Sequence, residues 1–191
     1  MTAPPGYAIP FENRQQVIAL EQRYLEGDAR ALYPDAAALA AGEAILSNDN
    51  LRENLRIVFR WKLQSFLKKF KWVKKFPGNE ISDNQIREAI DVARNADCAD
   101  PRTIETALRV LDALPYVGIP VASAFLTAIR PSRFTVIDRQ AYKALCVAFP
   151  KNLQPEEYVH YLDFCKGQAT RLGVSLRTYD RALWQHGSER G

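Results

Sequence analysis

The chain has 191 residues, enough for one domain with a sizeable core. Hydrophobic residues make up 47% and charged residues 25% of it, as in ordinary globular proteins. The sequence contains no run of eighteen apolar residues, so it predicts no transmembrane helix. The first residues lack the basic and apolar regions of a secretion signal. We therefore expect a monomeric cytoplasmic protein, nucleoid-associated in a prokaryote, with no membrane partner.

The three cysteines are Cys98, Cys146 and Cys165. Their odd number and wide spacing argue against a disulfide framework or a tetrathiolate metal site. We expect them to be reduced, as small apolar residues of the core.

Positive charge is concentrated in residues 52–75. This stretch carries a net charge of +8, although the whole chain carries only +4. Its one acidic residue is Glu53, and its nine basic residues are Arg52, Arg56, Arg60, Lys62, Lys68, Lys69, Lys71, Lys74 and Lys75. Such a stripe favours a polyanionic partner such as DNA, and the alternative is a solvated helix face.

The apolar pattern is helical nearly throughout. Apolar spacing, capping residues and proline positions predict helices over residues 11–26, 34–46, 50–66, 83–96, 101–114, 119–130, 139–149, 155–172 and 175–186. Only residues 134–137 could be extended, which is too short to found a sheet. The sequence therefore predicts an all-α fold of eight to ten helices.

A tight turn joins two of these helices at residues 114–122. The first helix ends at Leu114-Pro115, three residues turn the chain, and the second begins near Pro120, where the missing N–H of proline is tolerated. The start of a helix presents unpaired backbone N–H groups and a positive dipole end, which suits a phosphate. The small residues after it, Ala122, Ser123 and Ala124, favour close helix packing.

Residues 114–145 read LPYVGIPVASAFLTAIRPSRFTVIDRQAYKAL. The pattern h-x-x-L-P-x-V-G-x-x-x-A-x-x-h, followed by V-I-D and another helix, resembles the helix-hairpin-helix DNA glycosylase superfamily. The resemblance covers 32 residues and implies one domain, residues 1–191, folded as a two-lobed helical bundle. One lobe would be residues 48–137, a helical barrel containing the hairpin 114–122. The other would be residues 1–47 with 138–191, leaving a cleft between the lobes.

Several residue roles follow from this resemblance alone. Asp138 matches the catalytic aspartate, and Pro115, Tyr116, Val117 and Gly118 match the turn that holds a DNA phosphate, often with a monovalent cation. Pro120 stands where bifunctional members carry a lysine, and proline has no amine for a Schiff base. The resemblance thus implies a monofunctional glycosylase that hydrolyses the bond to a damaged or modified base. Cys146 and Cys165 are too few for the iron–sulfur cluster of some members, so we expect no cofactor besides the cation.

Tyr116 replaces the first glycine of the usual turn. If that position has a positive φ, tyrosine costs energy there, and the ring could instead be used to stack on a base or sugar. Excision requires the target base to leave the stack, and aromatic rings commonly hold it or fill the gap. The candidates for this are Trp61, Trp72 and Tyr116.

Phosphate contacts are expected from basic side chains as well as from the hairpin. The candidate residues for DNA binding are Pro115, Tyr116, Val117, Gly118, Pro120, Lys62, Lys68, Lys69, Lys71, Arg130, Arg133, Arg139 and Lys143.

Other interpretations of the same residues stay open. Asp138 could simply cap the helix over residues 139–149, and Trp61 could be a half-buried core residue. The chain could then be a non-catalytic helix-hairpin-helix DNA-binding module in a repair or defence complex. A helical protein-interaction domain is a third reading, which predicts no DNA binding at low salt.

Overall fold

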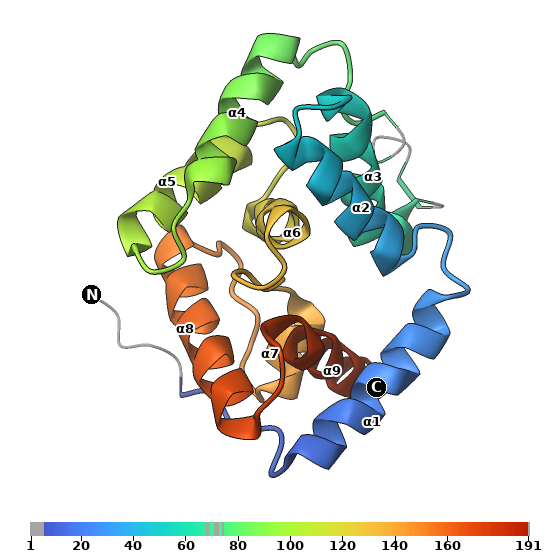
Figure 1. Ribbon diagram of the computed structural model, residues 1–191, viewed down its shortest axis with the longest axis vertical. Coiled ribbons are helices and arrows are strands. Elements are labelled where there is room, and N and C mark those ends of the chain that lie inside the picture. Colours follow the sequence, from blue (N-terminus) through green and yellow to red (C-terminus); the bar gives the residue numbers. More distant parts are fainter. Residues whose placement is uncertain (1–5, 68, 71–72, 74, 191) are drawn as a thin grey trace.

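The computed structural model describes residues 6–67, 69–70, 73 and 75–190, and this part of the chain is helical without strands, which confirms the all-α class (Figure 1). The elements are α1 (Arg14–Asp28), α2 (Asp35–Leu46), α3 (Leu51–Leu63), η1 (Gln64–Phe66), α4 (Asp83–Asn95), α5 (Pro101–Asp112), α6 (Ile119–Ile129), α7 (Arg139–Ala144), α8 (Pro155–Leu172) and α9 (Leu176–Glu189). None of the helices described there is both long and apolar enough to cross a bilayer.

Most helices begin close to the predicted positions, but α1 begins at Arg14 and not at the expected residue 11. Asn13, Ser82, Asp100 and Ser175 each accept a backbone N–H bond at the start of α1, α4, α5 and α9. Pro101 follows its cap directly, at the first helical position.

Two predicted helices end earlier than expected. α3 stops at Leu63 and continues as the short 3₁₀ turn η1, and the expected helix over residues 139–149 stops at Ala144. There the N–H of Val147 bonds to the carbonyl of Tyr142, and that of Cys146 bonds to the carbonyl of Lys143. These two bonds form a Schellman cap with Cys146 in the left-handed position, at φ +56°. A cysteine in the place usually taken by glycine gives no sequence signal of a helix end.

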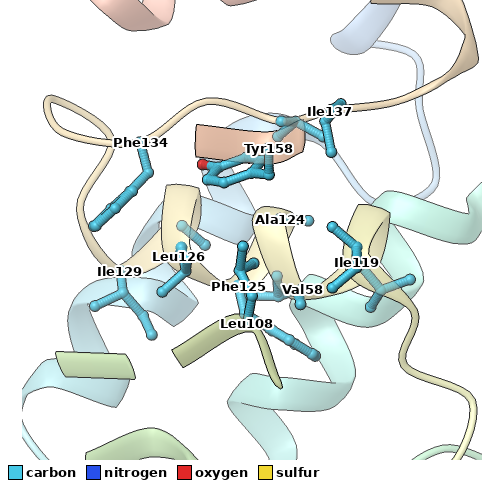
Figure 2. Packing of buried hydrophobic residues seen from close by; sticks show 14 of the residues in the cluster. Val58, Leu108, Ile119, Ala124, Phe125, Leu126, Ile129, Phe134, Ile137 and Tyr158 are labelled. Carbon is cyan, nitrogen blue, oxygen red and sulfur yellow. The ribbon is translucent and has the colours of Figure 1, made fainter. Parts of the chain in front are cut away.

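α6 is the central helix of the core. Every residue from Val121 to Ile129 is buried, and α2, α3, α4 and α5 all pack on it. Figure 2 shows Phe125 of α6 beside Val58 of α3 and Leu108 of α5, with Phe134 and Tyr158 on the opposite side. α2 approaches α6 closely at Gly42. A Cβ on Gly42 of α2 would lie 1.9 Å from the carbonyl oxygen of Ala128.

The remaining helices pack around α9. α1, α7 and α8 all contact it (Figure 1). α7 and α9 approach closely, because a Cβ on Gly187 would lie 1.9 Å from the carbonyl oxygen of Gln140. α2 packs on α3 and α6, so the lobe boundary expected between residues 47 and 48 separates two helices that contact each other.

Candidate functional site

The hairpin lies between the end of α5 and the start of α6. The N–H of Val117 bonds to the carbonyl of Leu114 at 3.1 Å, which closes the turn, and the Val117 side chain is buried. Tyr116 adopts φ +69°, and the residue is 53% exposed. The turn therefore does require positive φ at the position where the resembled family has glycine. A left-handed non-glycine residue costs about 1–2 kcal/mol.

Gly118 is the N-cap of α6, and no side chain of the described residues caps it. Its φ is −96°, which any residue can adopt. A Cβ there would meet only Cδ of Pro120, at 3.7 Å. A larger residue at position 118 would therefore be neither strained nor crowded within the chain. Because glycine has no side chain, a ligand can approach the backbone closely at this position.

The implied monovalent cation would need backbone carbonyls of this turn. The carbonyl of Leu114 accepts the N–H of Val117, and that of Gly118 accepts the N–H groups of both Val121 and Ala122. These two oxygens are engaged within the chain, and the monovalent cation stays a prediction.

Side chains hold the extended residues 134–137 from both sides. The hydroxyls of Tyr158 and Tyr161 donate to the carbonyls of residues 135 and 136 at 2.9 and 3.0 Å. Oγ of Ser123 accepts the N–H of residue 137 at 3.2 Å, and Oδ1 of Asp180 accepts that of residue 136 at the same distance. The segment is buried and held through its backbone, so the position of the next residue, Asp138, is tightly constrained.

Asp138 uses its two carboxylate oxygens differently. Oδ1 accepts the N–H groups of Gln140 and Ala141 at 2.9 and 3.0 Å, which caps α7. Oδ2 accepts from Nζ of Lys62 on α3 at 2.7 Å. The side chains of Asp138 and Lys62 are only 17% and 10% exposed. Capping therefore accounts for one oxygen, and the second belongs to an ion pair shielded from water.

Lys62 does not lie where the basic stripe would put it. It follows Leu55, Val58 and Phe59 at spacings of seven, four and three residues, so it lies on the inward face of α3. Its ammonium is engaged by Asp138, and the expected phosphate contact by Lys62 is not supported.

The arginines of the stripe also have partners within the chain. Arg52 binds Asp83 and the carbonyls of residues 78 and 81, and Arg56 binds Glu53 and the carbonyl of residue 76. Arg60 donates to the Tyr33 hydroxyl. These side chains secure the loop before α4 and the end of the α1–α2 connection, rather than forming a free basic face.

The other candidate contacts differ in exposure, and two of the exposed ones lie over aromatic rings of the chain, Lys69 over Phe70 and Arg139 over Phe149. Arg130 is half-buried and donates to the carbonyl of Arg94 at 2.7 Å, so its expected phosphate contact is not supported either. Lys68, Lys71 and Trp72 lie outside the described residues. The exposed candidates are Lys69, Arg133, Arg139 and Lys143.

Trp61 is in the core, as the alternative interpretation held. It is buried, and the guanidinium carbon of Arg177 lies 5.3 Å from its ring centroid. The ring is covered within the chain and is not placed to stack on a base. Among the described aromatic candidates this leaves Tyr116.

A buried ionic cluster lies behind the Lys62–Asp138 pair. Arg177 on α9 binds both Asp35 of α2 and Asp180, and Arg181 also binds Asp35, at 2.6 Å. Burial raises the pKa of Asp180 above its usual range, while the positive charge of Arg177 opposes that shift. Asp180 was not among the residues predicted from the sequence, although its position could have indicated a buried charge. It shares the inward apolar stripe of α9 with Leu176 and Leu183.

Two surface hollows lie elsewhere on the molecule. One is lined by the first turns of α3 and α4, including Asn50, Arg56 and Asp83, and the other by α4 and α5, including Asp91 and Thr106. Asp138 lines neither of them.

Comparisons of the chain with models of protein families, with curated proteins and with solved structures found no match. Any assignment of function therefore depends on the geometry of Lys62, Asp138 and the hairpin, together with the resemblance of residues 114–145.

Proposed function

We propose that this protein is a DNA glycosylase that hydrolyses the bond between deoxyribose and a damaged or modified base, with Asp138 as the catalytic carboxylate. One observation carries the proposal. Oδ1 of Asp138 is sufficient to cap α7. Oδ2 nevertheless accepts a hydrogen bond at 2.7 Å from the ammonium of Lys62, which lies 76 residues earlier on another helix. Burying such a pair costs desolvation energy that a cap does not require.

The chemistry needs a fixed anion beside the sugar. Positive charge develops on C1′ as its bond to the base breaks, and a carboxylate at that point stabilises the transition state. Water then adds its hydroxyl to C1′, while the base leaves with the bonding electron pair and receives the water's proton. In this proposal Asp138 stabilises the sugar cation and orients the water, and Lys62 keeps the carboxylate in place.

The hairpin supplies the second support for the proposal. The uncapped start of α6 at Gly118 suits a DNA phosphate, and the exposed ring of Tyr116 suits an unstacked base or sugar. The exposed side chains of Lys69, Arg133, Arg139 and Lys143 would neutralise further phosphates.

A panel of modified DNA duplexes tests this function. The wild type and Asp138→Asn are incubated with oxidised, alkylated, deaminated and phage-type modified bases. Released bases are identified by mass spectrometry, and abasic sites are counted in parallel. We expect at least one base to be released by the wild type and not by the variant. No release from any duplex would contradict the enzyme proposal for that panel.

The alternative is a non-catalytic DNA-binding module that uses the same hairpin. The cap that Asp138 provides to α7 favours it, since a purely structural role would retain those two hydrogen bonds. Salt-sensitive DNA binding by both proteins, without base release, would support the module.

A further inference from the structure

α9 places one charged side chain against each of the two chain segments that carry Lys62 and Asp138. Arg177 and Asp180 lie three residues apart on α9, are both buried and bind each other. Asp180 contacts the segment that leads into Asp138, and Arg177 contacts the residue that precedes Lys62. The same two side chains therefore touch both chain segments that form the pair.

The contact of Asp180 is with the backbone. Its Oδ1 accepts the N–H of Val136, two residues before Asp138, at 3.2 Å. Val136 is buried, so this N–H would have no water to replace the carboxylate. Loss of the acceptor would release one of the five side-chain bonds that hold residues 135–137.

The contact of Arg177 is with the Trp61 ring, at 5.3 Å from the guanidinium carbon. Asp35 and Asp180 each bind one nitrogen of the Arg177 guanidinium, which holds this group over the ring. Trp61 and Lys62 are consecutive on the last full turn of α3, so a fixed Trp61 ring also fixes the point from which the lysine side chain leaves the helix.

The charges of the two pairs also interact. Burial has the largest effect on the pKa of Asp180 and raises it, Arg177 lowers it, and Asp138 raises and Lys62 lowers it to a smaller extent. The pairs are thus close enough to sense one another inside the protein, where charges are poorly screened.

We infer that Asp180 and Arg177 are positioning residues for the proposed site, with Asp180 setting the place of Asp138 and Arg177 setting the place of Lys62. The catalytic consequence rests on the proposed glycosylase function. The positions themselves can be measured without any substrate.

The Asp180 half is tested by amide hydrogen exchange. Asp180→Ala removes the acceptor and the charge, Asp180→Asn keeps an acceptor oxygen, and Asp163→Ala removes an exposed carboxylate from α8 as the control. We expect Asp180→Ala to speed exchange at Gln140 and Ala141, whose N–H groups bind Asp138, by about tenfold relative to α8 amides. Asp180→Asn and the control should stay within about threefold of the wild type.

The Arg177 half is tested by the reactivity of the Lys62 amine. Arg177→Gln should raise acetylation of Lys62 by a small amine-reactive reagent about tenfold relative to exposed Lys151, and Arg177→Lys less. Peptide mapping by mass spectrometry gives both rates. Unchanged exchange in a folded Asp180→Ala, or unchanged Lys62 reactivity in Arg177→Gln, would overturn the corresponding half. If Asp180→Ala does not fold, Asp180→Ser, which is too short to reach Val136, replaces it in the same measurement.

Base release adds a catalytic readout. Asp180→Ala should lower kcat by about tenfold or more while KM changes little, because a misplaced carboxylate affects the transition state and not DNA contact. A change confined to KM would contradict positioning of Asp138. If the variants change amide exchange and Lys62 acetylation as expected but the wild type releases no base, the positioning roles are upheld and the glycosylase function is rejected.

Discussion

The ammonium of Lys62 lies 2.7 Å from Oδ2 of Asp138, and both side chains are largely shielded from water. The two residues are 76 positions apart and belong to α3 and to the start of α7. This contact links the segment after the hairpin helix to the basic part of the chain, and it fixes the direction of the carboxylate that we propose to be catalytic.

Replacing Lys62 should be costly for stability. In Lys62→Met the shielded Oδ2 of Asp138 loses its partner, and we expect the free energy of unfolding to fall by about 2 kcal/mol. Lys151→Met, at an exposed position, should change it by less than about 0.5 kcal/mol. Denaturant unfolding measures both. Adding Asp138→Asn to Lys62→Met should recover part of the loss, since asparagine also caps helices well. An additive double variant would show that the two side chains do not interact.

Tyr116 should be strained in the free protein. Tyr116→Gly relieves the left-handed backbone, but glycine has more freedom when unfolded, so we expect a net gain of about 0.5–1 kcal/mol. Tyr116→Ala retains the strain and serves as the matched control without a ring. If the ring contacts DNA, both variants should weaken DNA binding by about 1–3 kcal/mol. Lower stability of Tyr116→Gly than of Tyr116→Ala would contradict the strained turn.

Gly187 should be essential for the contact between α7 and α9. An added Cβ would lie 1.9 Å from the backbone carbonyl oxygen of Gln140, which cannot rotate away. We expect Gly187→Ala to destabilise the fold by about 1–3 kcal/mol. Gly167→Ala on α8, where no atom lies within 4 Å of the new Cβ, should be neutral or stabilising by up to about 1 kcal/mol. Thermal unfolding distinguishes the two, and equal effects would refute the close approach.

His186 should make the fold less stable in mild acid. Burial, followed by the positive charge of Arg190, lowers the pKa of His186 below its ordinary value of 6.5. Nε2 is buried and has no hydrogen-bond partner among the described residues. The unfolded chain therefore binds a proton more readily, so stability contributed by neutral His186 is complete above pH 6.5 and declines as the pH falls below it.

The melting temperature between pH 7.5 and 5.5 checks this sign. His186→Gln should show a smaller fall than the wild type, whereas His160→Gln, at an exposed position, should follow the wild type. Identical pH profiles of His186→Gln and the wild type would reject a role for His186.

Local signals were sufficient for most of the fold. Capping residues and prolines located most of the helix starts, although not that of α1, because they act within a few residues of the chain. The end of α7 was missed because Cys146 adopts a left-handed conformation that glycine usually signals. Residues 68, 71, 72 and 74 lie outside the described part, so the predictions for Lys68, Lys71 and Trp72 stay predictions.

The candidate site was only half visible in the sequence. Asp138 stood out by its place after the hairpin helix, but its partner depends on how α3 meets α7, which local spacing does not encode. Charged residues on apolar stripes were the available signal, since Lys62 continues the stripe of Leu55 and Phe59, as Asp180 does on α9. A charge on such a stripe needs a buried partner. Lys62 pairs with Asp138, Asp180 pairs with Arg177, and the two pairs are neighbours in the fold.

The most direct test of the central claim is single-turnover base release by the wild type and Asp138→Asn, on a duplex that both proteins bind to saturation. Asparagine retains a capping oxygen for α7 but loses the ion pair with Lys62, so the rates are compared only on folded variant protein that binds the duplex. We predict a fall in the rate of base release of about a thousandfold or more, because the variant lacks the negative charge that stabilises the sugar cation. Equal rates in the two proteins, or no release from the wild type, would contradict a catalytic role for Asp138.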